Sequence, residues 1–107
     1  MTIHELKCWP EYFHAIKSGQ KRFEVRKDDR NFQIGDLLHL LEWCPGGGNF
    51  TGRRLWYCVT YVMRGGAFGI DPAYCVLGIE MATVGQLSEV FESRMVEFPQ
   101  MKSGETK

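Results

Sequence analysis

A lysine, a carboxylate and an arginine stand at short spacing in the first third of the chain. Lys21, Glu24 and Arg26 follow Gly19, in a segment from residue 17 to residue 30 that holds six basic and three acidic residues. Two cations around one carboxylate provide donors and an acceptor for a small anion or for the edge of a nucleobase. The same charges also occur on solvated strand faces, where an ion pair contributes roughly 0.2–1 kcal/mol. The residue types alone leave both interpretations open.

The alternation of residue types predicts that these groups lie on a β-strand. Phe23 and Val25 alternate with charged residues, which is the period-two pattern of a half-buried strand. If the two apolar side chains face the core, Glu24 and Arg26 point together at the other face. Lys21, at the start of the strand, would join them there. The sequence therefore predicts a polar surface on which the three charged groups converge.

A short helix is expected directly before this strand. Apolar side chains recur at helical spacing through residues 10–18. Pro10 suits the first helical position, and Gly19 suits the left-handed conformation that ends a helix. The helix and the glycine together would fix the position of Lys21, which follows them.

The spacing of these residues resembles a known family signature. Gly19-x-Lys21-x-x-Glu24-x-Arg26 resembles the G-x-K-x-x-E-x-R signature of the ASCH domain, a small β-barrel related to the PUA domains of RNA-modifying proteins. The flanking motifs resemble one subfamily of small phage and bacterial proteins of unassigned function. The matching positions are His4-Glu5-Leu6-Lys7, Tyr12-Phe13, Lys21 through Arg30, Phe32, Gly35-Asp36 and Phe50-Thr51-Gly52-Arg53. The resemblance covers roughly residues 3–80 and implies an α+β fold built on a small mixed β-barrel, with the short helix before the second strand.

The resemblance also implies a pocket for single-stranded RNA, for a nucleotide or for a modified nucleoside. The residues that would line it are His4, Lys7, Lys21, Glu24, Arg26 and Arg30. Lys21 and Arg26 would meet phosphate or carbonyl oxygens, and Glu24 would accept hydrogen bonds from the amino edge of an unpaired base. For His4 the alternative is a buried structural histidine.

Two other functions remain open at this point. A small bacterial protein with the same fold hydrolyses the acetyl amide of acetylcytidine, with the signature lysine, a threonine and a glutamate. Lys21 matches that lysine, but Glu24 stands in place of the threonine, and the third residue has no evident counterpart here. Lys21 and Glu24 would be catalytic only in an enzyme of this kind, with Glu24 as a general base on water. The third function is a phage or bacterial protein-interaction factor with an apolar docking surface.

The remaining segments alternate between strands and turns. Strands are expected over residues 3–7, 37–43, 53–63 and 74–79, and a glycine-rich loop over residues 44–49. Phe32 and Ile34 are expected in the core, and Asp36 is expected to cap the following turn with its carboxylate. In the strand over residues 53–63, either Trp56 or Tyr57 faces inward.

A capping box predicts a last helix. Thr83-Val84-Gly85-Gln86 has the T-x-x-Q pattern, which opens a helix expected to end near residue 93. The chain is then one domain over residues 1–95, with a flexible tail over residues 96–107. At the base of the glycine loop, Trp43 and Phe50 would either stack on an unpaired base or close the end of the barrel.

Charge and composition narrow the classes of partner and site. The net charge of the 107 residues is zero, which argues against sequence-blind binding of duplex nucleic acid. Residues 1–64 carry ten basic and seven acidic residues, whereas residues 65–107 carry three and six. The four cysteines and three histidines show no zinc spacing, so neither a metal nor a cofactor is expected. No membrane-spanning run or leader is recognised, and a cytoplasmic protein is expected.

Overall fold

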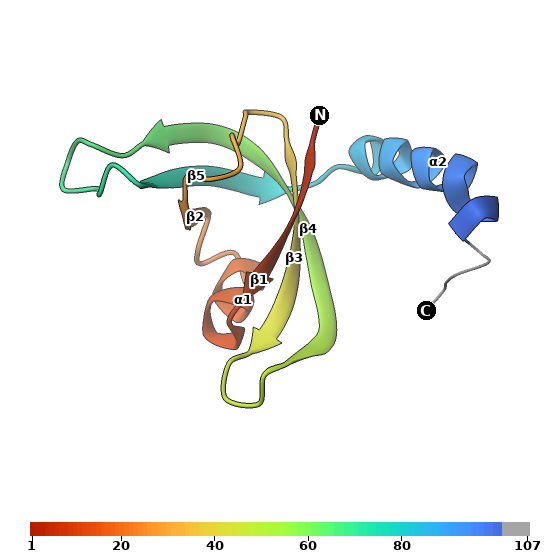
Figure 1. Ribbon diagram of the computed structural model, residues 1–107, viewed down its shortest axis with the longest axis horizontal. Helices are drawn as coiled ribbons and strands as arrows, with labels where there is room; N and C mark the ends of the chain where they lie inside the picture. The colour runs from red at the N-terminus through yellow and green to blue at the C-terminus, as the bar shows by residue number, and fades with distance from the viewer. Residues whose placement is uncertain (102–107) are drawn as a thin grey trace.

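The structure, a computed structural model, describes the backbone of residues 1–101 and the side chains of residues 1–92 (Figure 1). Its elements in chain order are β1 (Ile3–Cys8), α1 (Pro10–Lys17), β2 (Phe23–Lys27), β3 (Leu37–Cys44), β4 (Asn49–Arg64), β5 (Tyr74–Met81) and α2 (Val84–Met101). The α+β class expected from the sequence is confirmed, and so is a short helix before the second strand.

The five strands form one mixed sheet that curves into a half-barrel. Their order is β1-β3-β4-β5-β2, with β1 parallel to β3 and every other pair antiparallel. The strand β4 has 16 residues, so that its first part pairs with β3 and its second part with β5. Figure 1 shows β4 bending from one hairpin into the other. The strands β1 and β2 therefore lie at the two edges of the sheet.

The concave face of the sheet holds the main core. Phe13 and Ile16 of α1 pack there with apolar residues of all the strands except β2. A smaller core lies under the start of α2, where Leu37 and Cys58 contact Ala82 and Val90. Beyond that contact α2 extends away from the sheet (Figure 1). Leu37, Leu41 and Trp43 alternate along the face of β3 that α2 touches at its Leu37 end. Neither core includes Leu41 or Trp43, so the end of this β1-β3-β4 face away from α2 is uncovered by either helix.

Local signals for α1 and α2 were mostly correct. α1 begins at Pro10, and Gly19 follows it with φ of +86° and donates its N–H to the Ile16 carbonyl. The capping box is present, since Thr83 and Gln86 exchange hydrogen bonds of 2.8 and 3.1 Å. α2 continues to Met101, so the expected end near residue 93 is wrong; residues 102–107 of the expected tail lie outside the described residues. None of the helices in the described part of the chain combines the length and the apolar character needed to span a membrane.

Four side chains settle the remaining expectations about the core. Tyr57 faces inward and donates its hydroxyl to the Ile16 carbonyl at 3.1 Å, whereas Trp56 stacks on His39. Ile34 is 64% exposed, so its expected place in the core is wrong, although Phe32 is buried as expected. A turn after Phe32 carries Ile34 outward before the chain enters β3.

Candidate functional site

The strand β2 presents its charged face to the interior, which is the reverse of the sequence expectation. Glu24 is only 4% exposed, while Phe23 and Val25 are 45% and 50% exposed. The period-two alternation is correct, but its phase is inverted. The interior offers partners to the Glu24 carboxylate, which come from β1, from Arg26 of β2 and from Lys21 just before this strand.

Glu24 is held between two cations and a thiol. The Arg26 Nε lies 3.3 Å from one carboxylate oxygen, and the Lys21 Nζ lies 3.7 Å from the same oxygen. The Cys8 Sγ lies 3.9 Å from the other oxygen. Burial, and then the Glu24 charge, raise the pKa of Cys8 from 9.0 to about 11, so Cys8 stays a thiol and does not act as a thiolate nucleophile. Lys21, Glu24 and Arg26 thus converge as the sequence predicts, although from the opposite face of the strand.

A cavity of about 410 Å³ opens over this carboxylate. Its lining residues are Tyr12, Lys21, Phe23, Glu24 and Val25. The Lys21 ammonium lies 4.9 Å from the centre of the Phe23 ring and 5.5 Å from that of Tyr12, and it donates a 2.8 Å hydrogen bond to the Phe23 carbonyl. The cavity therefore combines two exposed aromatic side chains with a buried acceptor and a fixed cation. Planar heterocycles with an amino edge fit that combination of groups.

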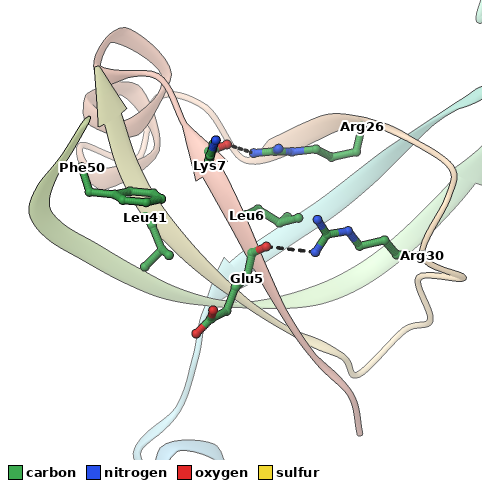
Figure 2. Close-up of a pocket in the computed structure, with 7 residues that line it drawn as sticks. All are labelled: Glu5, Leu6, Lys7, Arg26, Arg30, Leu41 and Phe50. Atoms are coloured by element: carbon green, nitrogen blue, oxygen red, sulfur yellow. Dashed lines mark hydrogen bonds between the residues drawn. The ribbon is translucent and has the colours of Figure 1, made fainter. Parts of the chain in front are cut away.

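A second cavity, of about 480 Å³, lies beside β1 (Figure 2). Its lining residues are Glu5, Leu6, Lys7, Arg26, Arg30, Leu41 and Phe50. Figure 2 shows Arg26 and Arg30 on one side of β1 and Leu41 and Phe50 on the other. The Lys7 ammonium lies 4.0 Å from the centre of the Trp43 ring. Arg26, which lines this second cavity, also contacts Glu24, which lines the first one.

The two arginines also join the edges of the half-barrel. Arg26 donates to the Lys7 carbonyl at 2.8 Å, and Arg30 donates to the Glu5 carbonyl at 2.9 Å. These carbonyls belong to the edge of β1 that does not pair with β3. Side-chain hydrogen bonds thus take the place of a strand ladder between β1 and β2.

His4 lies outside both cavities. It is buried, its Nε2 lies 2.8 Å from the Asp36 carboxylate, and its ring packs against Phe32. Asp36 also accepts from the backbone N–H groups of Thr2 and Gln33, which confirms its expected capping role. Burial acts to raise the pKa of Asp36, but these hydrogen bonds outweigh it and hold the pKa below its usual value.

A third polar cluster, centred on Glu42, was not found from the sequence. Glu42 is fully buried, and one of its oxygens accepts from the Thr51 hydroxyl and from the Arg53 Nε, both at 2.6 Å. The other oxygen lies 3.2 Å from the Nε2 of the half-exposed His14 of α1. The hydrogen bond from Thr51 lowers the pKa of Glu42, burial opposes it, and Arg53 adds to the lowering. Glu42 is therefore an ionised, buried carboxylate.

A bulge in the sheet makes this cluster. Between the pairs Leu41–Arg54 and Trp43–Phe50, β3 contributes one residue and β4 contributes three. Gly52 is among these three and has φ of +96°, a conformation that side chains strongly disfavour. The signal in the sequence was a single acid within an apolar strand, together with a Thr-Gly-Arg segment on the next strand.

The geometry excludes some kinds of site within the described residues. They include no group of three or more histidine, cysteine or acidic side chains that could hold a metal ion. All four cysteines are free thiols. What the structure offers instead is a pair of adjoining cavities, one with a buried carboxylate and one lined by cations.

The fold and these cavities define a small α+β half-barrel protein in which Lys21 and Arg26 hold the buried Glu24 of the second strand. The chain belongs to the family described as a domain of unknown function, DUF3850, whose model matches residues 3–79. It is also 49% identical over 53 residues to an uncharacterised 12.9 kDa protein in the GpA 3′ region of Escherichia phage P2. That match spans 50% of this chain and 47% of the phage protein, so the chain spans about half the length of this relative.

Proposed function

We propose that this protein binds a nucleotide or a modified nucleoside, alone or within single-stranded RNA, in the cavity over Glu24. The observation that carries the proposal is a buried carboxylate, held by Lys21 and Arg26, at the floor of a cavity lined by Tyr12 and Phe23. The base would lie against the aromatic side chains and donate its amino group to Glu24. Base–aromatic stacking contributes about 1–3 kcal/mol per base.

The neighbouring cavity supplies the groups for a phosphate. Lys7, Arg26 and Arg30 line it. The guanidinium groups of Arg26 and Arg30 have donors beyond those used on the β1 carbonyls. The likeness of Gly19-x-Lys21-x-x-Glu24-x-Arg26 to the ASCH signature supports the same assignment by analogy.

The first experiment is a thermal-shift screen combined with mass spectrometry of the added compound. The compounds are the common nucleosides, their 5′-monophosphates, N4-acetylcytidine and other modified nucleosides, and a short single-stranded RNA. We expect a nucleoside or nucleotide to raise the melting temperature and to be recovered unchanged. If no compound shifts the melting temperature, the proposal is wrong and a protein partner becomes the better explanation.

Two variants test whether binding depends on the buried carboxylate. Glu24→Gln keeps the shape but removes the charge, and loss of a charge-assisted hydrogen bond of about 1.5–3 kcal/mol weakens binding roughly 10- to 100-fold. Glu11→Gln removes the same charge from the exposed first turn of α1 and serves as the matched control. Equal binding by both variants would contradict the assigned role of Glu24.

The screen also tests the enzymatic alternative. The Lys21 ammonium lies 3.7 Å from Glu24, so Glu24 could act as a general base on water while Lys21 stabilises an oxyanion. Consumption of the acetylated nucleoside, with release of acetate, would favour an amidohydrolase over a binding module. In that case Glu24→Gln should lower the rate while leaving the protein folded.

A further inference from the structure

The uncovered end of the β1-β3-β4 face carries basic side chains next to exposed aromatic ones. The strand register places Lys7, Leu41 and Arg54 in one row across β1, β3 and β4. Lys7 and Arg54 therefore stand two strand spacings apart, about 10 Å. The next pair along, Trp43 and Phe50, packs edge to face with ring centres 4.7 Å apart.

Cavities on the two sides of Phe50 make this surface a continuous path. Leu41 and Phe50 line both the 480 Å³ cavity beside β1 and a smaller one of about 140 Å³. The smaller cavity is completed by Gly52, Arg53 and Arg54. We call the surface formed by Lys7, Arg30, Phe50, Arg53 and Arg54 the basic strip. It begins next to Arg26, which lines the 480 Å³ cavity and contacts Glu24.

Most of the charge of the basic strip is not neutralised by ion pairs. Lys7, Arg30 and Arg54 have no ion-pair partner among the described side chains, and Arg53 shares the buried Glu42. The acid on this surface, Glu5, lies 3.3 Å from His39. A protein whose net charge is zero thus has three cations without an ion-pair partner on the surface that includes the 48% exposed Phe50. Cations along a groove with an aromatic side chain between them match the alternating phosphates and bases of a single strand.

We propose that the ligand is a single-stranded polynucleotide that continues from the cavity over Glu24 along the basic strip. One base occupies that cavity, its phosphate lies against Arg26 and Arg30, a following base stacks on Phe50, and the next phosphate meets Arg54. The inference rests on the proposed function and extends it, because it names a polymer of several nucleotides in place of a free nucleoside. It also assigns roles to Phe50 and Arg54.

The test compares ligand lengths in fluorescence anisotropy and thermal shift. The probes are single strands of 3, 6 and 9 nucleotides of mixed sequence, as RNA and as DNA, the four nucleoside 5′-monophosphates, and a nine-residue oligoglutamate. We expect the 9-nucleotide strand to bind at least tenfold more tightly than any monophosphate. Contacts of Arg26 and Arg30 with one phosphate and of Arg54 with the next predict a slope of about −1.4 in the plot of log affinity against log salt concentration, at about −0.7 for each phosphate.

A variant at the far end of the basic strip isolates the polymer contacts. Arg54 is exposed and lies outside the cavity over Glu24. Arg54→Gln should weaken binding of the 9-nucleotide strand about fivefold and reduce the salt slope by about 0.7, while the response to monophosphates stays unchanged. Lys17→Gln, which removes an exposed charge at the end of α1, is the matched control and should change neither.

Each outcome separates this inference from the proposed function. If monophosphates bind but affinity does not rise with length, the strip does not bind a polymer and the proposed function stands. If neither monophosphates nor strands bind, both are wrong. If oligoglutamate binds as tightly as the 9-nucleotide strand, the strip serves an acidic protein and the inference is overturned. Equal affinity for RNA and DNA would support it and would show that the 2′-hydroxyl is not read.

Discussion

Replacing Glu42 with glutamine should destabilise the fold by a measurable and pH-dependent amount. The carboxylate accepts two 2.6 Å hydrogen bonds, from Thr51 and Arg53, and is fully buried. A hydrogen bond to a charged group contributes about 1.5–3 kcal/mol, roughly twice a neutral one, so the neutral amide loses about 1 kcal/mol for each. Arg53 is more than half exposed, and water compensates part of its share. We expect a loss of about 1.5 kcal/mol in the free energy of unfolding.

The pH dependence has a definite sign. The folded-state pKa of Glu42 lies below its ordinary value of 4.5. Its contribution is therefore complete above pH 4.5 and disappears as the pH falls through the folded-state pKa. A protonated carboxyl group and the amide of Glu42→Gln are then similar, so the difference between the two proteins should shrink in acid.

Urea unfolding followed by tryptophan fluorescence measures both effects. The pH is varied from 7 to 3, and Glu11→Gln, at an exposed position, should stay within about 0.5 kcal/mol of the natural protein. A double-mutant cycle with Thr51→Val should give a coupling of about 1 kcal/mol between the hydroxyl and the carboxylate. A loss below about 0.5 kcal/mol at pH 7, or a difference that does not change with pH, would refute the reasoning.

Three further measurements probe other parts of the structure. Tyr57→Phe removes the hydrogen bond to the Ile16 carbonyl and should cost about 1 kcal/mol in urea unfolding; an unchanged midpoint would show that water replaces the hydroxyl. Thr83→Ala breaks the capping box with Gln86 and should cost about 1 kcal/mol, with the helical signal in circular dichroism reporting whether α2 frays. Cys8 is buried and its pKa is about 11, so a thiol reagent at pH 8 should leave it unmodified until the protein unfolds; rapid modification of the folded protein, mapped by mass spectrometry, would contradict its placement.

Local patterns predicted the elements more reliably than the directions of their side chains. Pro10 and Gly19 mark the limits of α1 because helix ends depend on the chemistry of a few adjacent residues. The alternation in β2 gave the correct element, but Phe23 and Val25 face outward. Hydrophobicity alone favours the opposite phase. The observed phase depends on Lys7 and Cys8 of β1, which lie far from β2 in the sequence and provide partners for Arg26 and Glu24.

The part of the site that depends on nearby residues was predictable from the sequence, and the part that depends on distant residues was not. The convergence of Lys21, Glu24 and Arg26 follows from their spacing on one short strand and is present in the structure. The Glu42 cluster was missed because its members come from α1, β3 and β4, and only the bulge at Gly52 brings Thr51 and Arg53 to the same oxygen. A bulge of this kind depends on the register between two strands. The sequence of either strand taken separately does not contain that information.

The half-barrel is fastened along β1 by two guanidinium groups. Arg26 and Arg30 each donate to a single carbonyl of β1. Either hydrogen bond can therefore break without the other, whereas the hydrogen bonds of a strand ladder break together. A ligand that binds either arginine can use the remaining N–H donors of the guanidinium, or it can displace the carbonyl of Lys7 or Glu5. Holding the β1 edge and binding a ligand are thus two uses of the same arginine side chains. An anion that displaced both carbonyls would free this edge of β1 without breaking any backbone pairing within the sheet.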